Sequence, residues 1–240
     1  MRAERTDMTD ERADSNKVWY LQQNRLFSNA DGEVVEAYQH LFRMQVYPKR
    51  THVFDVGDPA RVVYLVKYGK VRIVRITVDG REVTTAVLGA GDIFGEQTLF
   101  DAAQPRTNFA VCVEETLLCL SRADDLFALL TSDPQVAVNV AKILSGRLDD
   151  ASETIEDVAY AKVADRLMHL FGRLSHDHGR ETPEGIAVDV TLTHGEIASA
   201  IGSTRETVSL ELSNLVRSGR LRQRDRTFIL PYEEDPITSR

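Results

Sequence analysis

The chain has little cysteine and no long apolar run, and these absences exclude several classes of protein. Cys112 and Cys119 stand in one strand-like stretch and form no CxxC pair, so we expect reduced core residues rather than a disulfide or metal site. No run approaches the roughly 18 apolar residues of a membrane span. Residues 1–17 lack the apolar core of a signal peptide. We therefore expect a soluble cytoplasmic protein with no membrane partner and a flexible charged tail at residues 1–17.

Histidine is absent between His52 and His169, where most of the strand-like segments fall. A cupin-like small-molecule enzyme would need histidine ligands on such strands, and no nucleophile–base pair stands out either. An enzyme is thus a remote alternative, and we expect no catalytic residue and no metal. We interpret His176 and His178, in the segment SHDHGRE, as part of a solvated polar loop.

Excess positive charge is also missing, since the formal net charge of the 240 residues is −8. Any nucleic-acid site must therefore be a local basic patch. Residues 204–226 supply one, with the arginines Arg205, Arg217, Arg220, Arg222, Arg224 and Arg226. The composition, 42% hydrophobic and 28% charged, is ordinary for a globular protein of one large or two modest domains.

Short strand-like runs separated by glycine turns fill residues 47–122. Asp79-Gly80, between two alternating runs, is a strong hairpin signal. Regularly spaced short strands predict an all-β roll or barrel. Residues 18–46 carry a mainly helical pattern, and we interpret them as a covering element.

Two short segments among these strands carry residues that suit a phosphate. They are Phe94-Gly95-Glu96 and, shortly after, Pro105-Arg106-Thr107. Glycine before a short helix lets backbone N–H groups approach an anion. Arg106 can bind a phosphate through two hydrogen bonds, and Thr107 adds a hydroxyl donor. Glu96 suits a neutral hydroxyl such as a ribose 2′-OH. A plain turn closed by a Glu96–Arg106 ion pair is the alternative.

A long helix is predicted from residue 133, with Asp133 as its N-cap and Pro134 at its first position. Apolar residues then recur at alternating spacings of four and three: Ala137, Ala141, Leu144, Leu148, Ala151, Ile155 and Val158. This heptad seam favours a coiled coil between two subunits over packing on the chain's own β-roll.

Residues 193–218 have the pattern of two short helices joined at Gly202. Thr193 with Glu196, and Ser203 with Glu206, each match a capping box. In the second helix the predicted buried stripe is Val208, Leu212, Leu215 and Val216, and the opposite face is mainly polar. Such a helix is what a helix-turn-helix inserts into a DNA major groove.

The surrounding segments complete a winged helix-turn-helix. An amphipathic helix is expected over residues 163–174, a strand at IAVDVTLT, and a turn near Asp225-Arg226 within LRQRDRTFIL. The predicted fold class is α+β. Its domains are a β-roll with covering helices at 18–132, a dimerisation helix and hinge at 133–162, and a DNA-binding domain at 163–240.

The segment from about residue 47 to 230 resembles the bacterial transcription factors of the cyclic-AMP receptor protein and fumarate-nitrate regulator family. The glycine-punctuated strands, the cassette FGE…PRT and the helix TRETVSLEL carry the resemblance. It implies that the cassette binds a cyclic nucleotide, with Gly95 and Glu96 at the ribose and Arg106 and Thr107 at the cyclic phosphate. The N-terminus lacks the cysteine cluster of the family's iron–sulfur members.

The resemblance also places the adenine beside the long helix, where cyclic-AMP-binding members have a threonine followed by a serine. This chain has Ala151 and Ser152 there, so one base contact is missing. A lost hydrogen bond of this kind weakens binding by about 0.5–1.5 kcal/mol.

For DNA, the resemblance implies that Arg205 reads guanine, Glu206 accepts from cytosine, and Thr204 and Thr207 contact phosphate. Glu206 competes for its own helix cap. Leu210 stands where many members have an arginine, and can offer only an apolar contact, for example to a thymine methyl group. Arg217, with Arg220, Arg222 and Arg224, is a candidate phosphate contact.

The implied function is a cyclic-AMP-responsive homodimeric regulator, an activator by the commoner family outcome. Its implied partners are a near-palindromic double-stranded DNA site and RNA polymerase, with the homodimer formed through residues 137–158. The alternative keeps DNA binding but changes the effector to 2-oxoglutarate or another nucleotide, or removes it.

Overall fold

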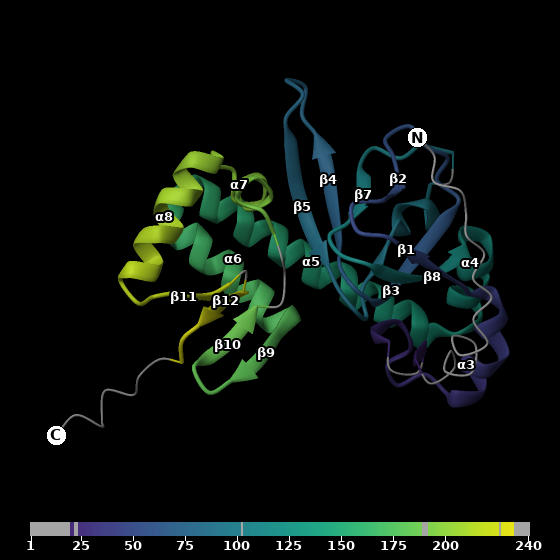
Figure 1. Cartoon of the computed structure of the whole chain (residues 1–240). Helices are drawn as coiled ribbons and strands as arrows, with labels where there is room; N and C mark the ends of the chain where they lie inside the picture. Colours follow the sequence, from purple (N-terminus) through teal and green to yellow (C-terminus); the bar gives the residue numbers. More distant parts are fainter. Residues whose placement is uncertain (1–19, 22–23, 102, 189–191, 226, 233–240) are drawn as a thin grey trace. The chain divides into compact units, whose positions relative to one another are not determined.

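The structure is a computed structural model that describes residues 20–21, 24–101, 103–188, 192–225 and 227–232 (Figure 1). By internal contacts the chain forms two units, one of Met1–Ile76 with Thr85–Asp149 and one of Thr77–Thr84 with Asp150–Arg240. The predicted tail at residues 1–17 lies outside the described residues. No helix in the described part of the chain is long and apolar enough to cross a membrane.

Two four-stranded antiparallel sheets form the centre of the first unit. Their orders are β1-β8-β3-β6 and β2-β7-β4-β5. The strands are β1 (Arg43–Tyr47), β2 (His52–Phe54), β3 (Val62–Tyr68), β4 (Val71–Ile76), β5 (Glu82–Leu88), β6 (Ile93–Phe94), β7 (Phe109–Cys112) and β8 (Thr116–Arg122). The division between the units passes through β5.

The strand β3 shows why the sheets pack as they do. Its side chains alternate, so Tyr64 and Val66 join the core between the two sheets, which also contains the aromatic cluster around Phe94. Val63 and Leu65 point into a second core, formed with the surrounding helices. Both faces of β3 are buried, and this accounts for its nearly continuous apolar sequence.

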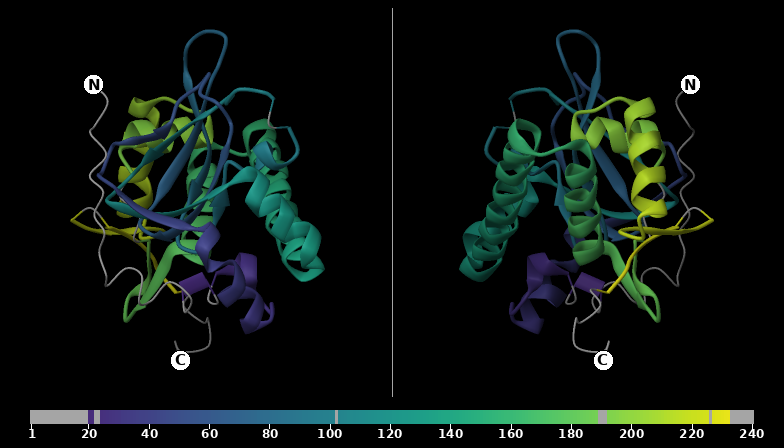
Figure 2. Two further views of the ribbon diagram at one scale, coloured as in Figure 1. Left: turned by 90° about the vertical axis from the view of Figure 1, so that its right-hand side faces the viewer. Right: turned by 90° about the vertical axis from the view of Figure 1, so that its left-hand side faces the viewer.

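Short helical elements cover the outer face of the first sheet (purple and teal in Figure 2). They are η1 (Arg25–Phe27), α3 (Gly32–Tyr38), η2 (Gln39–Leu41) and α4 (Ala123–Ser132). The expectation that residues 18–46 are mainly helical is wrong for residues 43–46, because β1 begins at Arg43 and pairs with β8. That pairing is with a strand some 70 residues further along the chain, so the local helical pattern did not predict it.

The long helix α5 (Pro134–Tyr160) begins as the sequence predicts. The Asp133 carboxylate accepts hydrogen bonds from the backbone N–H groups of Gln135 and Val136, at 2.8 and 3.4 Å. The helical run stops for Ala161 and Lys162 before the next helix starts. Buried Asn139 anchors α5 to the covering elements by donating to the carbonyl oxygens of Leu26 and Ser28.

The second unit combines three helices with a small antiparallel sheet of order β11-β12-β10-β9. Its elements are α6 (Val163–His178), β9 (Gly179–Thr182), β10 (Gly185–Val188), α7 (His194–Ile201), α8 (Arg205–Arg217), β11 (Arg222–Arg224) and β12 (Thr227–Leu230). The core includes Leu167, Phe171 and Phe228, and the two phenylalanine rings lie 4.8 Å apart.

The second unit differs from the local sequence predictions at one of three places. The loop expected at His176 and His178 is wrong, because α6 continues through both histidines and β9 follows directly, although His176 is exposed as expected. The turn at Asp225 is confirmed: its φ of 52° reverses the chain between the paired residues Arg224 and Thr227. Of the strand predicted at IAVDVTLT, β10 is present, and residues 189–191 lie outside the described part.

Candidate effector and nucleic-acid binding sites

The glycine of the cassette makes a turn that other residues adopt only with strain. Gly95 caps the short helix η3 (Glu96–Leu99) with φ 77° and ψ 11°, in the left-handed region. A Cβ atom on Gly95 would lie 3.0 Å from both Arg106 Nη1 and the carbonyl oxygen of Val62. Both the backbone angle and the space therefore require glycine here.

Arg106 is folded into the protein beside this turn. It is 5% exposed, and its guanidinium carbon lies 4.4 Å from the centre of the Phe54 ring. One terminal nitrogen donates to the carbonyl oxygen of Gly95 at 3.1 Å, and the other donates to that of Val62. Nε is buried and has no hydrogen-bond partner among the described residues. Burial lowers the pKa of Arg106, while Tyr64, Glu96 and Asp58 oppose the shift.

Glu96 does not form the simple ion pair with Arg106 that was the alternative for this cassette. It pairs instead with Arg147 of α5, whose Nη1 lies 3.1 Å from Glu96 Oε1. The other terminal nitrogen of Arg147 donates to the carbonyl oxygen of Ile93. The cassette is thereby joined to the long helix inside the first unit.

Sequence reasoning missed Arg147. It lies one helical turn before Ala151, on the face to which the family resemblance assigns the base, and this spacing was the available signal. Thr107 is exposed next to Arg106. Ala151 and Ser152 are exposed on α5, within the part of that helix that belongs to the second unit, so their role at the cassette stays a prediction.

The first helix of the predicted helix-turn-helix is capped as expected. The Thr193 hydroxyl accepts from the N–H of Glu196, and the Glu196 carboxylate accepts from the N–H of Thr193 at 2.7 Å. Gly202 ends the helix with φ 63°. The predicted two-helix unit is therefore confirmed at its start and at its turn.

The second cap differs from the expectation. Ser203 does not cap α8, because its backbone N–H donates to the carbonyl oxygen of Ala198 and completes the end of α7. Thr204 is the N-cap, and its hydroxyl accepts from the N–H of Thr207 at 3.2 Å. The capping box assigned to Ser203 and Glu206 is wrong, and the expected competition for Glu206 disappears.

The outer face of α8 is available for contact. Arg205 and Glu206 are exposed, and the structure gives neither side chain a hydrogen bond to another described residue. Leu210 is 60% exposed, opposite the buried Val208. Val216 was expected in the buried stripe but is 36% exposed, so only the other three members are buried.

A histidine that the sequence reasoning did not single out connects the two helices. His194 Nδ1 lies 2.7 Å from the hydroxyl of Ser209, which itself donates to the carbonyl oxygen of Arg205. The imidazole N–H is therefore the donor to Ser209. The bond fixes α7 to the face of α8 that carries Arg205 and Leu210.

Several arginines of the basic patch are engaged with neighbours inside the unit. Arg217 donates to Asn214 at 3.1 Å, Arg220 lies 3.4 Å from Asp165, and Arg224 pairs with Glu184. These contacts hold the end of α8 and the hairpin of β11 and β12, the wing, in place. The two carboxylate pairs also reduce the charge that Arg220 and Arg224 present to a phosphate, in contrast to Arg205 and Arg217.

Comparison with known proteins identifies both units. A family model for a cyclic nucleotide-binding domain matches residues 44–133, and a model for a Crp-like helix-turn-helix domain matches residues 161–234. The chain belongs to the cyclic-AMP receptor protein and fumarate-nitrate regulator family. As a member of this family it is a transcription regulator with a cyclic nucleotide-binding domain, and its relatives are regulators rather than enzymes.

Relatives and solved structures of the family carry different names. A cyclic AMP receptor protein from Thermus thermophilus is 33% identical, with 82% of this chain and 88% of the relative covered. A global nitrogen regulator from Synechococcus elongatus is 32% identical, covering 73% and 80%. The structure of a c-di-GMP responsive global regulator from Xanthomonas campestris is 28% identical with a TM-score of 0.71, covering 84% and 100%. Family membership therefore leaves the effector open.

The cassette turn gives a prediction on stability. Replacing Gly95 by alanine is expected to cost about 1–2 kcal/mol for the left-handed backbone, plus a further cost for displacing Arg106 and the Val62 carbonyl. Chemical denaturation would measure the loss. Gly80→Ala is a matched control, because Gly80 has φ 81° but nothing within 4 Å of a Cβ. Equal losses in the two variants would show that the close approach of Arg106 is unimportant.

Proposed function

We propose that this family member is a homodimeric DNA-binding regulator whose effector is cyclic AMP, held at the cassette of the first unit. The observation that carries the proposal is the arrangement of Arg106 at the Gly95 turn, with Glu96 beside it. A planar guanidinium over a left-handed glycine suits a phosphate, and a carboxylate nearby suits a ribose hydroxyl. The match to a cyclic nucleotide-binding family model supports this assignment.

Binding would exchange one set of hydrogen bonds for another. Arg106 would give up its two carbonyl acceptors for phosphate oxygens, with Thr107 adding a hydroxyl. Glu96 would divide its oxygens between Arg147 and the ribose. Because Arg147 is on α5, a change at Glu96 reaches that helix directly. Ligand binding would thus shift the balance between two arrangements of the long helix, as a population shift.

The second candidate function keeps DNA binding but has a different effector, or no effector. The missing hydroxyl at Ala151 and the name of the c-di-GMP responsive relative favour keeping it open. Arg106 would suit the carboxylates of 2-oxoglutarate equally well, but Glu96 would then have no hydroxyl to accept from. Arg106 and Glu96 also have partners within the protein, in the backbone carbonyl oxygens of Gly95 and Val62 and in Arg147, as an effector-free regulator would require.

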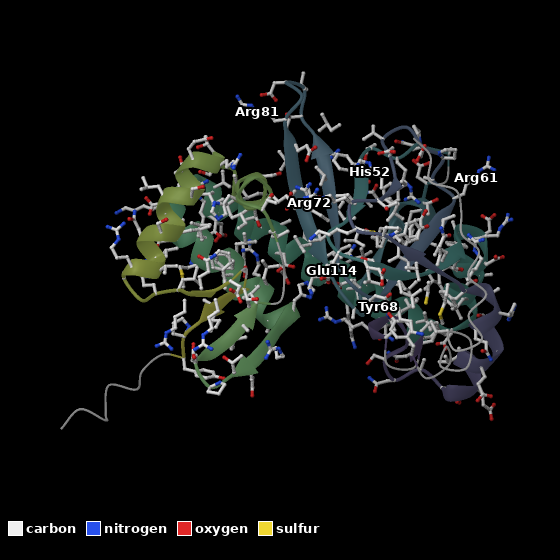
Figure 3. All side chains as sticks on the ribbon, viewed as in Figure 1. His52, Arg61, Tyr68, Arg72, Arg81 and Glu114 are labelled. Atoms are coloured by element: carbon white, nitrogen blue, oxygen red, sulfur yellow. The ribbon has the colours of Figure 1, made fainter. Side chains whose placement is uncertain are left out.

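Titration calorimetry with cyclic AMP, cyclic GMP, cyclic di-GMP and 2-oxoglutarate tests the effector. We expect cyclic AMP to bind, and Arg106→Leu to weaken it at least about a hundredfold, because two charge-assisted hydrogen bonds are lost. Glu96→Gln should weaken nucleotides but not 2-oxoglutarate. Arg61, at the surface of the first unit, supplies the control Arg61→Leu (Figure 3). Wild-type affinity in Arg106→Leu, with the fold checked by circular dichroism, would refute the cassette assignment.

Dimer formation is supported by apolar residues that the single chain leaves exposed. On α5, Leu148 is 68% exposed and Ile155 is 70% exposed, and both belong to the predicted heptad seam. Leucine and isoleucine repeated along one helix face are typical of a surface that a partner covers. The earlier seam residue Leu144 is half-buried and packs against the core of its own unit. The seam is therefore strongest over the second half of α5.

Sedimentation at decreasing protein concentration tests this surface. We expect Leu148→Glu and Ile155→Glu each to weaken the dimer by a factor of ten or more, because burying an unpaired carboxylate is costly, of order several kcal/mol. The control Ser145→Glu adds the same charge to α5 outside the seam. If all three variants stay dimeric at the same concentrations as wild type, the interface lies elsewhere.

Two copies of α8 would read a near-palindromic site in successive major grooves about 34 Å apart. The exposed Arg205 and Glu206 at the start of α8 are the proposed base-contacting residues, and Thr204 and Thr207 the proposed phosphate contacts. Leu210 would contact an apolar base edge, so the preference at that base pair is expected to differ from that of members with arginine. An activating contact with RNA polymerase completes the proposal.

DNA-binding titrations separate base reading from charge. Arg205→Ala is expected to lower affinity for the specific site by about 1–3 kcal/mol with little effect on random DNA, because a bidentate guanine contact is lost. Arg217→Ala, which removes the same charge from the other end of α8, should weaken both DNAs alike. An equal loss on the two DNAs for Arg205→Ala would instead make Arg205 a phosphate contact.

A further inference from the structure

A group of charged side chains joins the last turns of α5 to α6, across the non-helical residues Ala161 and Lys162. The centre of the group is Asp157, whose side chain is 14% exposed. Its Oδ1 lies 2.6 Å from His169 Nδ1, and its Oδ2 lies 3.7 Å from Arg173 Nη1. One carboxylate on α5 therefore contacts two basic side chains of α6, His169 and Arg173, which are one helical turn apart.

The charges of these side chains determine how they interact. An ionised carboxylate only accepts hydrogen bonds, so the His169 N–H is the donor. Arg173 Nη1 also lies 3.8 Å from Glu153 on α5, and this nitrogen is buried with no hydrogen-bond partner in the described part of the chain. Its interaction with the two carboxylates is therefore purely electrostatic, and burial keeps the solvent from screening it fully.

The same part of α5 is also close to the helix-turn-helix. A Cβ atom on Gly202 would lie 3.5 Å from Val158 Cγ2, so Val158 packs beside the turn between α7 and α8. Arg166 of α6 donates to the carbonyl oxygens of Ile201 and Gly202, at 2.8 and 3.3 Å. The last turns of α5, the helix α6 and the turn at Gly202 are thus connected pairwise.

We propose that Asp157 is a positioning residue that locks the end of α5 onto α6, so that residues 150–160 and the helix-turn-helix behave as one rigid body. The division of the chain into units supports this, because it falls inside α5 after Asp149 and not at Ala161 and Lys162. The hinge that the sequence predicts at the end of the segment 133–162 is, on this view, a locked joint. The proposal requires neither a particular effector nor DNA.

The lock has a functional consequence. A rotation or displacement of residues 150–160 is passed to α6 and on to α8, instead of being absorbed by bending at Ala161 and Lys162. A signal that reaches residues 150–160 is therefore delivered to the DNA-reading helix. Asp157 acts on DNA recognition through α6 and touches no DNA itself.

Amide hydrogen exchange of the full-length protein, without effector or DNA, tests the lock directly. In Asp157→Asn we expect the amides of residues 163–166 to exchange about three- to tenfold faster, the effect of losing one partly buried charge-assisted contact. Glu156→Gln is the matched control, since it removes the same charge from the neighbouring, exposed residue of α5. Unchanged exchange in β3 of the first unit shows that the fold is kept. Equal exchange in the two variants overturns the proposal.

A double variant distinguishes a shared network from separate effects. Arg173→Gln should accelerate exchange in the same amides, and Asp157→Asn with Arg173→Gln should accelerate it by less than the product of the two single effects, because the contact between Asp157 and Arg173 is lost in both single variants. Fully multiplicative effects of the two substitutions would show that Asp157 and Arg173 act independently.

Rescue by a conservative variant supplies a readout that a merely structural contact would not change. Asp157→Glu keeps a carboxylate on this face of α5, so protection at residues 163–166 should return toward the wild-type value, whereas the uncharged Asp157→Asn should not restore it. His169→Gln removes the ring N–H that contacts Asp157 while leaving Arg173 in place, and should accelerate exchange in the same amides. Wild-type exchange in His169→Gln overturns the role of His169.

Discussion

The buried guanidinium of Arg106 is the interaction on which the effector cassette depends. A full positive charge lies over the Phe54 ring, at the end of the aromatic cluster that the two sheets enclose, and carbonyl oxygens of Gly95 and Val62 hold it there. Each partner constrains the others. Gly95 must lack a side chain so that the guanidinium can approach its backbone, and Val62 must begin a strand so that its carbonyl oxygen is presented at that point. The position of the Arg106 guanidinium, on which the proposed anion binding depends, therefore follows from the packing of the whole β-roll.

The long helix α5 extends this constraint beyond the cassette. Arg147 ties α5 to Glu96 and to the backbone at Ile93, while Asn139 ties its first turns to the covering elements. Further along, Asp157 pairs with His169 and Arg173 of α6. One continuous helix thus carries charged contacts to the effector cassette near its middle and to the DNA-reading unit near its end. Its exposed apolar residues between and beyond these contacts are what a second subunit would cover.

The DNA-reading unit depends on two kinds of contact. Its helix ends are stabilised locally, by Thr193 with Glu196 and by Thr204 with Thr207. The orientation of α8 depends on contacts between residues distant in sequence, such as His194 with Ser209 and Arg220 with Asp165. The second kind uses several arginines of the basic patch for internal pairing. The exposed charge of Arg205 and the exposed apolar surface of Leu210 are the features of this face that the proposed reading of DNA would use.

Local chemistry determined much of this protein from the sequence by itself. The glycine turns, the Asp133 cap, the Thr193 capping box, the two-unit order and the family all follow from short-range patterns. The tertiary structure alone decided the rest, because it depends on distant pairs. Residues 43–47 form a strand because they pair with β8. Thr204 rather than Ser203 caps α8, while the N–H of Ser203 bonds to the carbonyl oxygen of Ala198. Glu96 forms its ion pair with Arg147 rather than with Arg106. Spacing along the chain carries no record of such partners, since folding alone brings them together.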